Sequence, residues 1–169
     1  MVASPNPILG VLDSDNSAGL NTAESPAGSG AVEAVLLEWF ASKNLPTVPS
    51  NFNGRSDYAS FIANGIPAGG LFTGAEGIKT PEQAALFGGE AGKAYDPNYH
   101  QIGDTINNLD YDAWIKNAKA SAHAIATFIA STKRIEDQQN NSGLRIAPSA
   151  TSFETLSVVE GDACGGDAI

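Results

Sequence analysis

Glycines and prolines divide this chain into short segments, and this punctuation limits the length of every helix and strand that it can form. The 18 glycines and 9 prolines gather in runs such as GIPAGGLFTGAEG at 65–77. Such runs mark turns, because glycine adopts left-handed backbone conformations and proline breaks both helix and sheet hydrogen bonding. The pattern predicts short regular elements joined by tight loops, and 169 residues are enough for one domain with a core.

Three short segments are expected to be strands. Residues 8–13, ILGVLD, are an apolar run before a polar loop, and IPAGGLF at 66–72 is typical of a buried strand whose glycines allow close backbone approach. A weaker strand is expected near 46–50, and its two prolines limit it to an edge position or a short length.

Helical spacing of apolar residues follows or precedes each of these strands. Ser29 is expected to cap a helix over AVEAVLLEWFASKN. Ser56 or Asp57 is expected to cap a shorter helix that ends near Ala63, and Pro81 begins another that reaches Phe87.

A long helix is predicted from Tyr111 to about Thr132. Its apolar stripe is expected to face a core, and the members of the stripe are Trp114, Ile115, Ala118, Ala122, Ile125 and Ile129. Strands that alternate with helices indicate an α/β fold. About three strands are few for a sheet covered on both faces, so an incomplete domain is expected.

Charge and composition exclude several classes of function. The formal net charge is −10 and the pI is about 4.4, so a nucleic-acid partner is not expected. No apolar run is long enough to span a membrane. The segment MVASPNPILGVLDSD has neither the basic nor the apolar part of a signal peptide. The single cysteine, Cys164, cannot form an intrachain disulfide, and no partner suggests a catalytic thiol.

The composition becomes polar and aperiodic after Arg134. We therefore divide the chain into a folded portion, 1–134, and a mostly disordered tail, 135–169. Asn140-Asn141-Ser142 in this tail is a glycosylation sequon that matters only in a secreted protein.

His100 is the residue on which a catalytic interpretation depends. Asp96, His100 and Asp104 are four residues apart, which would align three metal ligands on a helix, but Pro97 and Gly103 oppose a helix there. His100 is then either a hydrogen-bonded loop residue or one ligand of a site completed by distant residues. His123 lies within the long helix and is expected to be a structural or surface histidine.

The other sequence motifs that we considered do not indicate a specific function. No nucleophile elbow, phosphate-binding loop, paired CxxC or dinucleotide fingerprint is present, and GEAGKAY at 89–95 lacks the Ser or Thr that a phosphate-binding loop carries after its Lys. Arg55 stands on a tight turn in NGRSDY. Its guanidinium could bind a carboxylate or carbonyl of a ligand, or form a surface salt bridge.

Several segments together resemble one family. MVASPNP, GRSDYASF, GIPAGGLFTGAEGIKT, FGGEAGKAYDPNYHQIGDTINNL and the long helix are similar, in order, to the C-terminal half of the zinc-dependent aminopeptidases of the fungal vacuolar aminopeptidase Y and secreted bacterial leucine aminopeptidase type. The resemblance implies the C-terminal part of an α/β/α sandwich with a mixed sheet. It also implies a vacuolar or extracellular location, and a catalytic domain that holds two zinc ions.

The resemblance assigns a role to six residues. His100 matches a zinc ligand, and Tyr99 matches the tyrosine that stabilises the tetrahedral oxyanion. Arg55 matches the arginine beside the bound N-terminal residue of a peptide substrate. Met1, Gly54 and Phe72 match the family positions that line the apolar pocket for the Leu-like first side chain of the substrate.

Two departures from the family bear on function. The first His, the bridging Asp, the general-base Glu and two further acidic ligands of the family fall before Met1, so this chain alone is expected to bind zinc weakly and to be inactive. A cysteine pair that often brackets the Tyr-His motif is replaced by Asn98 and Gly103, so that packing and hydrogen bonds must hold this loop.

Three functions remain open at this point. The first is a portion of an aminopeptidase that hydrolyses apolar N-terminal residues from peptides. The second is a non-catalytic peptide-binding or assembly module that uses the pocket at Phe72 and Arg55. The third, which the loop signals disfavour, is a new metal site built from Asp96, His100 and Asp104.

Overall fold

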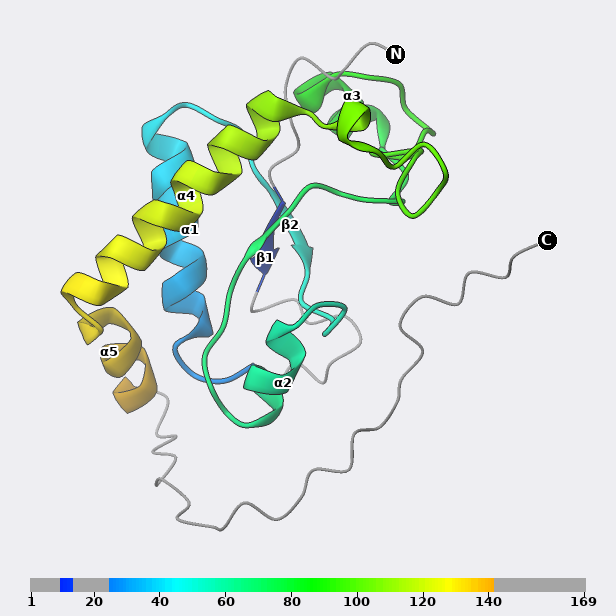
Figure 1. Cartoon of the computed structure of the whole chain (residues 1–169). Helices are drawn as coiled ribbons and strands as arrows, with labels where there is room; N and C mark the ends of the chain where they lie inside the picture. Colours follow the sequence, from blue (N-terminus) through cyan, green and yellow to red (C-terminus); the bar gives the residue numbers. More distant parts are fainter. Residues whose placement is uncertain (1–9, 14–24, 142–169) are drawn as a thin grey trace.

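A computed structural model describes residues 10–13 and 25–141 of the chain (Figure 1). Helices dominate, and three short strands lie beside them. In chain order the elements are β1 (Gly10–Asp13), α1 (Ser29–Ser42), β2 (Val48–Asn51), α2 (Tyr58–Ala63), β3 (Leu71–Phe72), α3 (Pro81–Phe87), the 3-10 helix η2 (Ile106–Asn108), α4 (Tyr111–Ala130) and α5 (Lys133–Asn141). This mixture of helices and few strands is compatible with part of an α/β domain.

The three strands form one sheet in the order β2-β1-β3. β1 pairs with β2 in parallel, with Gly10 opposite Val48, and pairs with β3 antiparallel, with Gly10 opposite Phe72. β2 therefore lies at an edge of this sheet, as its prolines predict. No helix among the described residues is long and apolar enough to cross a membrane.

The segment 66–72 was expected to be a buried strand, but only Leu71–Phe72 is strand and Phe72 is exposed. The glycines that precede this strand allow the backbone to approach a neighbouring helix closely. A Cβ placed on Gly69 would lie 2.7 Å from Val32 Cγ1, so the chain passes directly against α1 there. The expected role of the glycines is confirmed, and the expected length of the strand is wrong.

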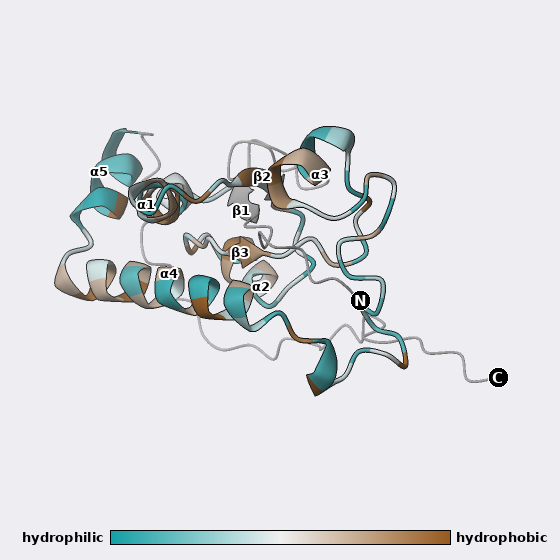
Figure 2. Cartoon of the chain, turned by 90° about the horizontal axis from the view of Figure 1, so that it is seen from above, coloured by the Kyte–Doolittle hydropathy of each residue, from teal (hydrophilic) through white to brown (hydrophobic). Residues whose placement is uncertain are grey.

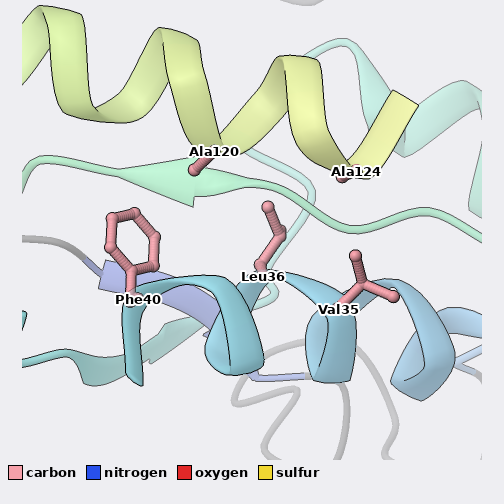
Figure 3. Packing of buried hydrophobic residues seen from close by; sticks show 5 residues of the cluster. All are labelled: Val35, Leu36, Phe40, Ala120 and Ala124. Atoms are coloured by element: carbon pink, nitrogen blue, oxygen red, sulfur yellow. The ribbon is translucent and has the colours of Figure 1, made fainter. Parts of the chain in front are cut away.

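The main core lies where α1 packs against α4, beside β3 (Figure 3). From α1, Val35, Leu36 and Phe40 point toward α4, where Ala120 and Ala124 face them. Phe40 and Ala120 are completely buried. Alanine side chains are small, so they let the two helices approach closely.

The apolar stripe predicted to bury α4 is the wrong one. Trp114, Ile115, Ile125 and Ile129 are 51–82% exposed, and Ala118 and Ala122 are exposed as well. The buried residues of α4 are instead Ala113, Ala120 and Ala124. The helix carries two apolar stripes, and α1 covers the one made of alanines.

The start of α1 also differs from expectation. The N-cap is Gly28, with φ of 106°, and no side chain caps the helix there. Ser29 is the first helical residue, and its buried hydroxyl accepts a hydrogen bond from the Ala68 N–H at 3.2 Å. The serine satisfies a loop amide from another part of the chain rather than its own helix.

The two short helices were placed correctly, with one difference in capping. α2 begins at Tyr58 without a side-chain cap from Asp57, whose carboxylate accepts a hydrogen bond from the Ser56 hydroxyl at 3.1 Å. α3 has Pro81 in its first turn as predicted, and Thr80 and Gln83 form a reciprocal capping box.

A helix that the sequence did not predict lies at the start of the segment 135–169, which we expect to be a mostly disordered tail. α5 covers Lys133–Asn141 and packs against α1. Arg134 forms a two-pronged ion pair with Glu38 at 3.0 and 2.8 Å, and Gln138 accepts the Ala31 N–H at 2.8 Å. These polar contacts hold α5 without an apolar stripe, so periodicity did not reveal the helix. Residues 142–169, including Cys164, lie outside the described residues.

Candidate active site

A cleft of about 570 Å³ opens between the turn before α2, strand β3 and the loop that carries Tyr99. One side of the cleft is apolar or backbone, from Gly69 to Phe72. The other side is polar and includes Arg55, Glu76 and Tyr99. A pocket with one apolar wall and a few converging polar groups is typical of a small-molecule or peptide site.

The turn that presents Arg55 is anchored by an aromatic stack. Phe52 is buried, and its ring stacks on Tyr58 with the centroids 4.7 Å apart and the planes 5° apart. The Tyr58 hydroxyl accepts the Gly54 N–H at 2.9 Å. Gly54 has a φ of 78°, which glycine adopts without strain. The backbone of the turn is therefore fixed next to the cleft.

Arg55 forms an ion pair with an acidic residue that also lines the cleft. Its guanidinium lies 2.7 Å from the Glu76 carboxylate, which comes from the glycine-rich loop after β3. The pKa of Arg55 is raised by this hydrogen bond, and the pKa of Glu76 is lowered by a hydrogen bond from its own backbone N–H and then by Arg55. Both side chains are more than half exposed, so the pair orients groups rather than stabilising the fold.

The loop that carries Tyr99 and His100 is held by a network around Asp96. The Asp96 carboxylate accepts the Asn98 N–H at 2.8 Å and the Asn108 side-chain amide at 3.2 Å. Asn98 also donates to Asn108 Oδ1 at 2.7 Å, and its side chain packs so closely on Gly103 that a Cβ there would overlap it. The expectation that packing and hydrogen bonds hold this loop is confirmed.

Tyr99 and His100 form one aromatic unit. Their rings stack with the centroids 4.0 Å apart and the planes 15° apart. His100 has a φ of 55°, a left-handed conformation that is uncommon for a non-glycine residue and concentrates at functional sites. The His100 N–H donates to Asp104 at 3.2 Å, which helps to hold that conformation. Tyr99 lines the cleft, whereas His100 is exposed and is not among the residues that line it.

The local metal trio is not formed. Within residues 10–13 and 25–141 no three His, Cys, Asp or Glu side chains are grouped to hold a metal ion. Asp96 and Asp104 are instead engaged in shaping the loop. His123, the other histidine, is exposed on α4 as expected. The described residues thus do not group the three ligands that a catalytic zinc site needs.

The structure brings together three of the six predicted site residues. Arg55, Phe72 and Tyr99 line one cleft, and His100 is stacked on Tyr99. Gly54 lies in the anchored turn but does not line the cleft, and Met1 lies outside the described residues.

Glu76 was missed by sequence reasoning. The signal that could have found it is an acidic residue in the glycine-rich run directly after the strand, in TGAEG.

Comparison with known proteins places this chain in a family. The family model described as peptidase family M28 matches residues 6–125. The chain is 55% identical over 128 residues to the "Probable leucine aminopeptidase 2" of Aspergillus fumigatus, covering 76% of this chain and 25% of that protein. It is 50% identical over 133 residues to the "Leucine aminopeptidase 2" of Trichophyton rubrum, covering 79% of this chain and 26% of that protein.

The chain belongs to peptidase family M28. It spans about a quarter of the length of the curated relatives that it matches.

Proposed function

We propose that this chain is the C-terminal portion of the catalytic domain of a zinc-dependent aminopeptidase that releases apolar, Leu-like residues from the N-termini of peptides. The observation that carries the proposal is the convergence of Arg55, Phe72 and Tyr99 on one cleft, with His100 stacked on Tyr99. The names of the relatives support the same reaction. The parent fold is then an α/β/α sandwich, to which these three strands contribute one part of a mixed sheet.

In this proposal each residue of the cleft has a separate task. Phe72 and Leu71 line the cleft and offer an apolar surface for the first side chain of the substrate, and the family resemblance assigns Gly54 and Met1 to the same pocket. Arg55 faces the bound N-terminal residue from the polar side. The Tyr99 hydroxyl donates a hydrogen bond to the oxyanion that develops when the scissile carbonyl is attacked.

His100 is the one zinc ligand that the described residues supply. Two zinc ions in the complete domain would polarise the carbonyl and provide hydroxide at neutral pH. A catalytic zinc site needs about three protein ligands, so residues outside those described must supply the others. We assign residues 1–134 and the packed helix α5 to this catalytic portion, and we place the complete enzyme in a vacuolar or extracellular compartment.

The proposal is tested in a chimeric enzyme. The Trichophyton rubrum relative receives this chain in place of the 133 residues that align with it. The chimera is expected to hydrolyse leucine p-nitroanilide, to lose activity on treatment with a chelator, and to recover it with zinc. A folded chimera that does not turn over, beside an active relative prepared in parallel, would contradict the proposal.

The 169-residue chain alone is expected to show no turnover with or without added zinc, because the described residues group no three metal ligands. Chelator-sensitive turnover that disappears in His100→Ala would contradict this expectation. Zinc-independent affinity of the chain for a leucyl peptide, in the absence of an active chimera, would favour a non-catalytic peptide-binding module instead.

A further inference from the structure

One sequence motif has no part in the proposed catalytic function. Asn140-Asn141-Ser142 is the one Asn-X-Ser/Thr sequon, with X other than proline, in the 169 residues. Asn140 lies in the last turn of α5, which the sequence did not predict to be ordered. The question is whether the helix presents this side chain or hides it.

One face of α5 is committed to α1. Arg134 binds Glu38, and Gln138 accepts the Ala31 N–H. Ile135 on the same side reaches the start of α1, where its Cγ2 would be 2.7 Å from a Cβ placed on Gly28. A modification on this face would separate the two helices.

Asn140 lies on the opposite face. A helix turns about 100° per residue, so Asn140 is rotated by roughly 200° from Gln138 and aligns with Lys133 and Asp137. Those two form an exposed ion pair at 2.7 Å. Asn140 is exposed, and α5 lies at the outer end of the molecule beside α1 (Figures 1 and 2). Among the described residues, its amide therefore lies away from the face that packs on α1.

The cleft is made of other elements. Its lining comes from residues 50–58, 69–77 and Tyr99, and α5 contributes nothing to it. A large hydrophilic group on Asn140 can therefore coexist with an open cleft and with the contact between α5 and α1.

We propose that Asn140 is a site of N-linked glycosylation. This inference rests on the vacuolar or extracellular location of the proposed function, because the reaction occurs on proteins that enter the secretory pathway. The Asn140 side-chain nitrogen forms a bond to the anomeric carbon of a lipid-pyrophosphate-linked oligosaccharide. The bond between that carbon and the pyrophosphate oxygen breaks, the lipid pyrophosphate leaves with the electron pair, and the amide nitrogen gives up one proton.

The test separates acceptance of the site from catalytic activity. The full chain is translated with a cleavable secretory leader in the presence of eukaryotic microsomes, and only the leader-cleaved, protease-protected fraction is scored. We expect one mobility shift that peptide N-glycosidase removes, with conversion of Asn140 to aspartate in the mass spectrum. Asn140→Gln and Ser142→Ala should each abolish the shift.

Asn141→Gln is the matched control, because it changes the neighbouring asparagine and leaves the sequon Asn-X-Ser intact. It should retain the shift at the wild-type level. Protected wild-type chain without glycan, or a shift that persists in Asn140→Gln, would overturn the proposal. Because no turnover is measured, an inactive chimera together with a glycosylated chain would sink the proposed function alone.

Discussion

Replacing Tyr99 with phenylalanine in the chimeric enzyme is expected to lower kcat by about 100-fold or more and to leave KM for leucine p-nitroanilide nearly unchanged. The hydroxyl is proposed to bind the developing oxyanion, an interaction that exists in the transition state and not in the ground state. The ring remains, so the stack on His100 and the wall of the cleft stay in place. Steady-state kinetics of the purified variant measure both constants.

Tyr95→Phe is the control for this variant, since it removes a hydroxyl four residues away in the same loop. The Tyr95 hydroxyl is buried and has no hydrogen-bond partner among the described residues, and burial raises its pKa. Its removal is expected to leave kcat unchanged. Equal losses in Tyr95→Phe and Tyr99→Phe would indicate a general disturbance of the loop and would contradict the role given to Tyr99.

Phe40→Ala is expected to lower the free energy of unfolding by about 3–5 kcal/mol. Phe40 is completely buried between α1 and α4, and its ring meets Trp39 edge-on at 4.9 Å. Truncation leaves a cavity that the alanines of α4 are too small to fill. Urea unfolding of the chimera, followed by circular dichroism, measures the change.

Leu37→Ala on the same helix provides the comparison, because Leu37 is 38% exposed and lies outside the core cluster. We expect a loss of about 0.5 kcal/mol or less. Similar losses for the two variants would mean that α1 does not bury Phe40 against α4 in the complete protein.

Local signals in the sequence were sufficient to find most helices. Pro81 and the apolar spacing before Phe87 located α3, and the periodicity from Tyr111 located α4. Pro97 and Gly103, which oppose a helix, correctly predicted that His100 lies in a loop. These signals act over a few residues, and a single sequence contains them directly.

Packing between distant segments was harder to predict. Periodicity identified the stripe of Trp114 and Ile129 on α4, but it could not show that α1 covers the alanine stripe instead. α5 was missed because its contacts are polar and join residues about a hundred positions apart, as in Arg134 with Glu38. Neither partner is apolar, so neither contributes to a periodic pattern.

The candidate site was predicted only in part, because contacts between segments that are distant in the sequence leave no local signal. Arg55, Phe72, Tyr99 and His100 were named from the family resemblance, which reports residues with a shared role. Glu76 depends on a pairing across the cleft with Arg55, and only the three-dimensional arrangement reveals it.

In the proposed enzyme this chain supplies one zinc ligand, His100, to a site completed by other residues. The most direct measurement is the zinc content of the purified chimera after dialysis, determined by elemental analysis, with His100→Ala compared with His123→Ala. His123 is the only other histidine in the chain and lies exposed on α4.

We expect two zinc ions per molecule in the chimera and in its His123→Ala variant. We expect a lower zinc content in His100→Ala, and loss of turnover in that variant alone. His100→Ala that retains the full zinc content and the full activity would contradict this expectation.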